Sequence, residues 1–273
     1  MIPPTSIDGT DITGATIDGT DVQEITVDGD VVFSAQQLPV AYSNLVVWYP
    51  FDSAEYGGSN ADDVTAIIGG SGDDTAYDGT VNGATYQSSG GVTDINAGLN
   101  SGGFDFDGSN DFIEFTAPST LKGTGQRTIT CWFNTDTSSE TVLHTSAQEN
   151  NVGQGNVLTF STESGGFRLR VFSGKGIILQ NSYNNNENVF VSFSILDSDL
   201  SNSKVRVRSE NASSFSQDNF TGFPSIDTIT TDYLLGGAIF GRSDFNGTVD
   251  DFRVYNTFLS NSQIDQIYQN TQP

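Results

Sequence analysis

Two short segments of the sequence concentrate basic side chains that could bind anions. Six of the ten basic residues lie in FRLRVFSGK (167–175) and SKVRVRSE (203–210). If each segment is a strand, alternate residues lie on opposite faces, so the apolar residues face a core and the cations face solvent. Arginine binds sulfate or carboxylate groups through two parallel hydrogen bonds. The candidates for contact with an anionic glycan are Arg168, Arg170, Arg206 and Arg208, unless these cations only pair with neighbouring acids on a sheet surface.

A polar loop offers a second type of contact with sugars. The segment NSYNNNEN (181–188) combines Tyr183 with a cluster of amides. Aromatic rings stack on sugar rings, and amides exchange hydrogen bonds with hydroxyl groups. Tyr183 is therefore a further candidate glycan-binding residue, although an ordinary polar hairpin tip would have the same composition.

Residues suited to catalysis are scarce. His144 is the only histidine and lies in the strand-like segment TVLHTS without a nucleophile motif nearby, so we expect it to be structural. Glycoside cleavage needs two carboxyl groups, one of them in an apolar setting that raises its pKa, and alternation makes the one candidate, Glu114, an ordinary outward residue. Cys131, the only cysteine, lies in an alternating segment and is expected to be buried. The sequence thus predicts a protein that is not an enzyme.

The charge of the chain excludes one class of partner and indicates an environment. The sequence has 34 acidic and 10 basic residues, a formal net charge of −24, with 26 aspartates and three lysines. Such a surface repels nucleic acid. Repulsion among the acids is screened at about 1 M salt, where the Debye length is about 3 Å. The composition therefore favours a protein of a molar-salt environment, with an ordinary acidic extracellular or marine protein as the alternative.

The sequence contains no segment typical of membrane insertion or export. No apolar run is long enough to cross a bilayer, and the first residues, MIPPTSIDGT, do not resemble a signal peptide. We expect a protein that is made in the cytoplasm and is not inserted in a membrane.

The first 38 residues form a repeat of small turn units. IDGT recurs at 7 and 17, followed by VDGD at 27. Asp-Gly between β-branched residues is typical of two-residue hairpin turns. Each hairpin is too small to be stable alone, so we expect residues 1–38 to be a module for anchoring or oligomerisation, joined to the rest by a linker at 39–44.

The pattern from residue 45 to residue 273 predicts an all-β domain. Short alternating segments are separated by Gly, Asn, Asp and Ser, as in antiparallel two-sheet sandwiches and jelly rolls. Ser260 and Gln263 form a capping-box pattern at the start of a short C-terminal helix that should cover the sandwich.

Five motifs follow one another in a characteristic order in this domain. They are LVVWYPFD (45–52), DGTVNGATY (78–86), GGFDFDGSNDFIEF (102–115), RTITCWFN (127–134) and FNGTVDDFRVYNTFLSNSQIDQIY (245–268). This order resembles the laminin-G-like, concanavalin A-like jelly-roll family over about residues 43–271. The resemblance implies two antiparallel sheets whose first and last strands lie side by side. Members serve as lectins, adhesins, carbohydrate-binding parts of glycosidases and structural spacers, so the resemblance implies a fold more firmly than a function.

The resemblance also implies a calcium ion near the junction of the first and last strands. The matching acidic positions are Asp52, Asp78 and Asp250. Calcium takes six to eight oxygen ligands, which carboxylates and loop carbonyls supply. In a chain with 26 aspartates, acids at turns can equally be solvated caps.

An adhesive type of fold, an acidic surface and no export signal are explained together by a virion protein. We expect a structural protein of a halophilic archaeal virus, of the tail fibre, spike or turret type, assembled in the host cytoplasm and exposed on the particle after release. Residues 1–38 would bind sister chains, as in a trimer or pentamer, or other virion proteins. The jelly roll would contact a host surface glycan or S-layer glycoprotein. The alternatives are a cell-associated haloarchaeal lectin or adhesin, and a carbohydrate-binding module of a glycan-processing system.

Overall fold

The computed structural model describes six short strands near the start of the chain and most of the chain from residue 44 onward. The described residues are 5–7, 10–12, 16–17, 20–21, 24–27, 30–34, 44–51, 60–61, 77–87, 102–119, 123–137, 140–144, 158–163, 166–171, 175–179, 186–196, 202–219, 232–237 and 243–272. The description covers the backbone alone for the strands before residue 44 and for residues 166–171 and 175–179. The same holds for Asn60, Thr141, His144, Leu158, Phe160, Glu163 and Ser243.

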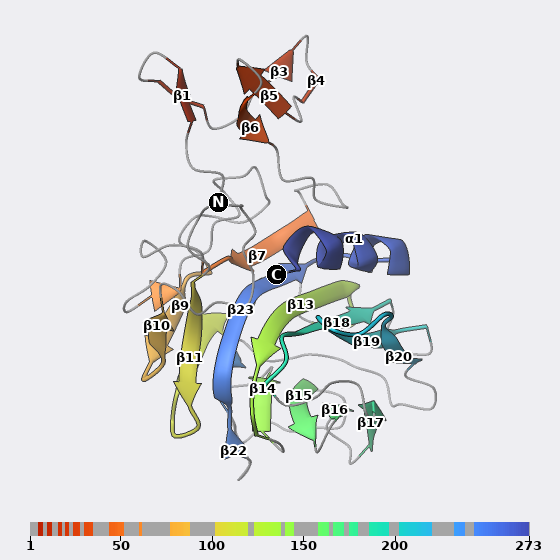
Figure 1. Ribbon diagram of the computed structural model, residues 1–273. Helices are drawn as coiled ribbons and strands as arrows, with labels where there is room; N and C mark the ends of the chain where they lie inside the picture. The colour runs from red at the N-terminus through yellow and green to blue at the C-terminus, as the bar shows by residue number, and fades with distance from the viewer. Residues whose placement is uncertain are drawn as a thin grey trace.

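The body of the protein is a sandwich of two β-sheets (Figure 1). In spatial order, the first sheet contains β10 (Thr85–Gln87), β11 (Gly103–Asp107), β23 (Asn246–Tyr255), β13 (Arg127–Asn134), β18 (Val189–Ile195), β19 (Lys204–Ser209) and β20 (Ser216–Asn219), with β7 (Leu45–Tyr49) also paired to β23. The second sheet contains β17 (Lys175–Leu179), β16 (Gly166–Val171), β15 (Leu158–Glu163), β14 (Glu140–His144), β21 (Asp232–Leu235), β12 (Phe112–Thr116), β9 (Gly79–Asn82) and β8 (Asn60–Ala61), with β22 (Ser243–Asp244) paired to β14. Among the described strands of the body, only the β14–β22 pair is parallel. The predicted all-β, antiparallel two-sheet sandwich is confirmed.

Alternating residues of both sheets fill the space between them. On β13, Ile129, Cys131 and Phe133 belong to this core, and Ile113 and Leu235 contribute from the second sheet. Cys131 is 3% exposed, and burial raises the pKa of its thiol, which keeps it protonated. The predicted packing role of this cysteine is confirmed.

The last strand organises the first sheet. β23 pairs with β13 along one side, while its other side pairs with β11 at residues 246–249 and with β7 at residues 252–255. The first strand of the body therefore lies beside the last, as the resemblance implied.

A β-bulge interrupts β23 at Asp251. The core-facing residues of the strand are Val249, then Phe252 and Val254, so the inward spacing is three residues at one point instead of two. The pairing with β13 shifts at the same place, and Asp251 has a φ of +46°. One extra residue is accommodated there, which is the defining feature of a bulge.

The bulge places a charged pair inside the protein. The Asp251 carboxylate accepts hydrogen bonds from Trp48 Nε1 at 2.8 Å and from Arg253 Nε at 2.7 Å, and the Arg253 guanidinium lies 4.5 Å from the centre of the Trp48 ring. Asp251 and Arg253 are 0% and 1% exposed. Burial raises the pKa of the Asp251 carboxyl, whereas the Arg253 charge and the two hydrogen bonds oppose that rise.

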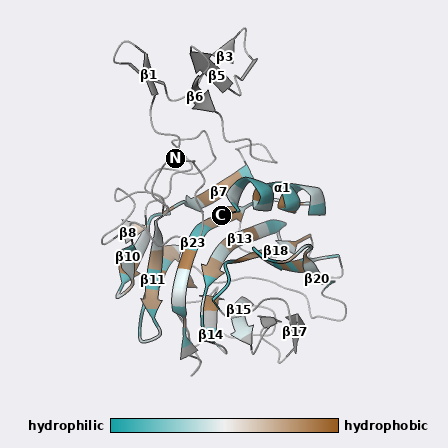
Figure 2. Ribbon diagram, in the orientation of Figure 1, coloured by the Kyte–Doolittle hydropathy of each residue, from teal (hydrophilic) through white to brown (hydrophobic). Residues whose placement is uncertain are grey.

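The helix α1 (Asn261–Thr271) packs on the outer face of the first sheet (Figure 1). Ser260 caps it with the predicted capping box, completed by Gln263. Its buried face joins a second apolar cluster, in which the Trp132 and Tyr268 rings lie 5.3 Å apart and Trp132 Nε1 donates to Thr271 Oγ1 at 2.8 Å. Figure 2 shows hydrophilic residues along α1 and hydrophobic residues along β7 beside it. No helix in the described part of the chain, α1 included, is long and apolar enough to cross a membrane.

The repeat near the start of the chain forms three hairpins. They are β1 (Thr5–Ile7) with β2 (Thr10–Ile12), β3 (Thr16–Ile17) with β4 (Thr20–Asp21), and β5 (Glu24–Val27) with β6 (Asp30–Ser34). In each, the residue before Asp-Gly pairs with the residue after it. The role of residues 1–38 in anchoring or oligomerisation, and the linker at 39–44, stay predictions.

Candidate functional site

The structure separates the four candidate arginines into two pairs on different sheets. Arg168 and Arg170 belong to β16 in the second sheet, whereas Arg206 and Arg208 belong to β19 in the first. The outward positions of two packed sheets lie on opposite sides of the sandwich. The four arginines therefore do not form one basic surface.

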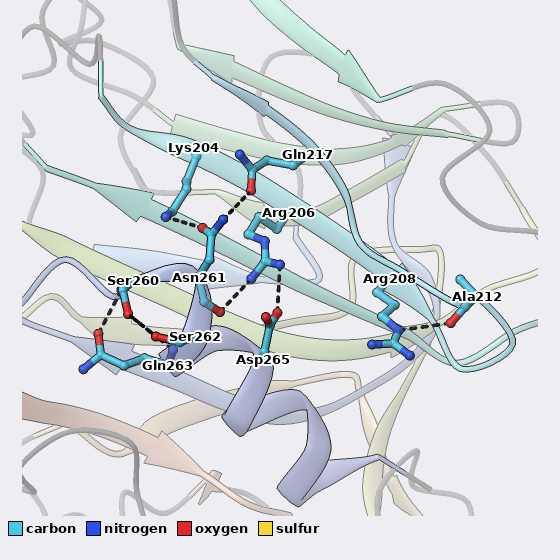
Figure 3. A network of polar contacts seen from close by, with 10 residues as sticks. All are labelled: Lys204, Arg206, Arg208, Ala212, Gln217, Ser260, Asn261, Ser262, Gln263 and Asp265. Carbon is cyan, nitrogen blue, oxygen red and sulfur yellow. Dashed lines mark hydrogen bonds and ion pairs between the residues drawn. The ribbon is translucent and has the colours of Figure 1, made fainter.

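Arg206 is buried between β19 and α1, with 6% of its surface exposed (Figure 3). Its Nη1 donates to the Asn261 backbone oxygen at 3.0 Å, and its Nη2 lies 2.8 Å from Asp265 Oδ1. The guanidinium also stacks on the Phe215 ring, 4.0 Å from its centre. The prediction that Arg206 faces solvent is wrong, because α1 covers this position. The alternative reading, a cation paired with an acid, describes it.

The neighbouring cations of β19 are also engaged. Arg208 is half-buried, donates from Nε to the Ala212 backbone oxygen at 3.1 Å, and lies 4.2 Å from the centre of the Tyr268 ring. The Lys204 ammonium donates to Asn261 Oδ1 and lies 4.7 Å from the centre of the Phe258 ring. The outward cations of β19 thus hold the C-terminal segment against the first sheet. Arg208 is therefore not freely exposed to solvent, although alternation predicted that it would be. Its contact with a glycan stays a prediction.

Arg170 lies in a row of paired residues that crosses the second sheet. The register joins Thr80, Glu114, Leu234, His144, Thr159 and Arg170 in that order, from β9 to β16. Directly paired residues share one face of a sheet. The adjoining residues Ile113, Leu235 and Leu143 are in the core, so this row occupies the outer face.

The exposure of this outer face differs along the row. Thr80 is exposed and Glu114 is half-buried, whereas Leu234 and Thr159 are 7% and 6% exposed. Arg168 pairs with Ser161, which is 1% exposed, and belongs to the same face. The outward placement predicted for Arg168 and Arg170 agrees with the strand register, while their glycan contact stays a prediction. Tyr183, the remaining candidate, lies outside the described residues.

The two residues considered for catalysis lie in this row but not on adjacent strands. Leu234 on β21 pairs with Glu114 on one side and with His144 on the other. Two strand spacings separate them, which is about 10 Å. Glu114 is a half-buried residue of the outer face, as expected from alternation. That the chain is not an enzyme stays a prediction.

The candidate calcium positions are only partly described. Asp78 is a half-buried residue directly before β9, and Asp250 is fully buried, where its Oδ1 accepts a hydrogen bond from the Asp251 backbone N–H at 2.7 Å. Asp52 lies outside the described residues. Within the described segments, no group of three or more His, Cys, Asp or Glu side chains is placed to hold a metal ion. Calcium binding stays a prediction.

Asp105 on β11 of the first sheet has a raised carboxyl pKa. Burial raises the pKa of Asp105, and the charges of Asp111 and Asp107 raise it further. A raised carboxyl pKa in the folded state means that this group opposes folding above its ordinary pKa of about 4 and not below it.

Asp105→Asn is therefore expected to raise the Tm slightly at neutral pH and low salt. The gain should vanish below about pH 4 and shrink at about 1 M salt, where the neighbouring charges are screened. Thermal unfolding of both chains across pH and salt concentration checks this. A gain that persisted in acid would contradict the electrostatic cause.

Comparison with solved structures identifies the architecture. The receptor binding domain of botulinum neurotoxin C/D mosaic serotype superposes with a TM-score of 0.53 at 12% identity over 84% of this chain. The binding domain of Paraclostridial Mosquitocidal Protein 1 gives 0.52 at 14% identity over 85%. Trypanosoma rangeli sialidase in complex with the inhibitor DANA gives 0.56 at 14% identity over 90%. The likeness is one of fold.

These similar structures are larger than the chain. The alignment covers 51% and 52% of the two toxin domains and 35% of the sialidase, so the chain spans about half of the former and about a third of the latter. A scan of the sequence against protein-family models finds no match. A comparison with curated proteins finds no significant match either.

Proposed function

We propose that the chain is a surface protein of a halophilic archaeal virion and that its sandwich attaches the particle to a glycan on the host surface. In this role the sandwich binds without catalysing a reaction, and residues 1–38 join the chain to sister chains or to other virion proteins. A calcium ion held by Asp52, Asp78 and Asp250 would stabilise the loops between the sheets.

The observation that carries the attachment part is the fold that more than four-fifths of the chain shares with a receptor binding domain and with a second binding domain. The outer face of the second sheet supports it. α1 packs on the other sheet, and the strand register assigns Arg168 and Arg170 to the outer face of the second sheet. Arginine at such a position suits sulfate or uronate groups.

The halophilic part of the proposal depends on the net charge of the chain. A formal net charge of −24 is tolerated best where molar salt screens repulsion. A cell-associated lectin or adhesin of a haloarchaeon would share the fold and the charge. Mass spectrometry of purified particles separates the two, because only the virion protein is found in them in stoichiometric amounts.

Binding of the purified chain to halophilic archaeal cells in molar salt tests the attachment function. The double variant Arg168→Gln/Arg170→Gln is expected to weaken binding at least about tenfold, because hydrogen bonds to charged groups contribute about 1.5–3 kcal/mol each. Asp218→Asn is the control, since Asp218 is an exposed charged residue of β20 on the opposite sheet. A wild-type chain that binds neither cells nor any glycan would contradict the function. If the double variant bound as tightly as the wild type, Arg168 and Arg170 would not contact the glycan.

A further inference from the structure

Three buried polar atoms beside the bulge of β23 have no hydrogen-bond partner among the described residues. They are Thr130 Oγ1, Asp251 Oδ2 and Arg253 Nη2. Their residues are at most 1% exposed, so bulk water does not reach these atoms. Buried polar atoms nearly always bond to the protein or to an ordered water molecule. Three such atoms in one place indicate a bound molecule, so their relative positions matter.

The three atoms belong to neighbouring side chains. Thr130 on β13 pairs directly with Arg253 on β23, so the two share one face of the sheet, and the register of the strands shifts immediately after this pair. Arg253 Nε donates to Asp251 Oδ1 at 2.7 Å, and Nη2 belongs to the same edge of the planar guanidinium as Nε. In a bidentate ion pair Nη2 would bond to Oδ2, but neither atom makes that bond. A donor and an acceptor are therefore unmatched at one edge of the pair.

Large aromatic side chains enclose this place. The Trp48 ring lies over the Arg253 guanidinium, with 4.5 Å between the ring centre and the guanidinium carbon. Trp132 and Tyr255 are the next outward residues after Thr130 and Arg253, and both belong with Trp48 to the apolar cluster on which α1 packs. Each of these three aromatic residues is at most 2% exposed. A molecule bound here is thus inside the protein and has to be small.

The chemistry of the three atoms identifies the class of ligand. Arg253 Nη2 can only donate a hydrogen bond, the ionised Asp251 carboxylate can only accept one, and the Thr130 hydroxyl can do both. The carboxylate would repel a halide ion, and the guanidinium would repel a metal cation. Water accepts from the guanidinium and donates to the carboxylate, and a buried water typically makes about three hydrogen bonds. The set of partners therefore matches water and excludes ions of either sign.

We infer that an ordered water molecule is bound between β13 and the bulge of β23, where it accepts a hydrogen bond from Arg253 Nη2, donates to Asp251 Oδ2 and bonds to Thr130 Oγ1. The water completes the buried ion pair, because it links the two atoms that the direct bond between Nε and Oδ1 leaves unmatched. A buried ion pair is stable only when its remaining polar groups are also bonded. The same water ties the bulge to β13 at the point where the register shifts. This site is independent of the proposed glycan contact.

A crystal structure of the full chain that resolves ordered water tests the site directly. We expect a water peak at hydrogen-bond distance, about 2.7–3.2 Å, from all three atoms. Crystals grown with bromide in place of chloride should give no anomalous signal at this position. A bromide peak, or a protein group that bonds to the three atoms in place of water, overturns the inference.

Thermal unfolding of Thr130→Val tests the site in solution. Valine keeps the shape of threonine and removes the hydroxyl, so the loss of one hydrogen bond to the water should lower the Tm by about 2–4 °C in a domain of this size. A hydroxyl without any partner is costly to bury, so an unchanged or higher Tm overturns the inference. Thr80→Val makes the same substitution at an exposed strand position and should change the Tm by less.

Discussion

Asp251→Ala is expected to lower the free energy of unfolding by about 3–5 kcal/mol, because it leaves the buried Arg253 charge without its partner. The guanidinium is 1% exposed and cannot regain water without opening the sheet. The variant also removes the acceptor for Trp48 Nε1, a buried donor. Denaturant unfolding at a fixed molar salt concentration measures the loss.

Two further variants identify the cause of this loss. Asp251→Leu/Arg253→Met replaces the ion pair with apolar side chains of similar size and should cost less than Asp251→Ala, because no unpaired charge remains. Asp218→Ala removes an exposed acid from β20 and should change stability by no more than about 0.5 kcal/mol. A double variant as unstable as the single variant would contradict the unpaired-charge explanation.

Ile267→Ala is expected to destabilise the protein by about 2–5 kcal/mol, because it leaves a cavity between α1 and the first sheet. Ile267 is 1% exposed in the apolar cluster that includes Trp132 and Tyr268. The measurement is again denaturant unfolding, followed by the fluorescence of Trp48 and Trp132, which both belong to this cluster.

Gln269→Ala, an exposed position on the same helix, is the matched control and should lie within about 0.5 kcal/mol of the wild type. If Ile267→Ala lost α1 without a change in unfolding of the sandwich, the helix would be an independent appendage. The engagement of Arg206 by Asn261 and Asp265 argues that it is not.

Periodicity and local motifs explain what could be predicted of the fold. Alternation in TITCWF placed Cys131 in the core, and the capping box at Ser260 fixed the start of α1. These signals are local, since a two-residue period and a capping box are both set by neighbouring residues. The Asp-Gly units likewise correspond to hairpins, because a two-residue turn determines its own strand pairing.

The candidate site could be predicted only in part, because alternation assigns a residue to a face but not to a sheet. FRLRVF and KVRVRS have the same pattern, yet β16 and β19 belong to different sheets, and only the second is covered by α1. In VDDFRV the spacing between the apolar residues is three instead of two, and this break in alternation is a weak signal of a bulge. Nothing in the segment indicates that Asp251 and Arg253 form a buried pair.

The sequence by itself determined the all-β class, the acidic surface, the hairpin repeat and the C-terminal helix, because each depends on composition or on residues close together in the chain. Only the tertiary structure decided that the cations of β19 are engaged by the C-terminal segment. α1 returns to the first sheet from the end of the chain and engages Arg206, 55 residues away from Asn261. The row from Thr80 to Arg170 likewise joins six strands that are scattered along the sequence. Pairing between distant strands is set by the packing of the whole core, and no local pattern encodes it.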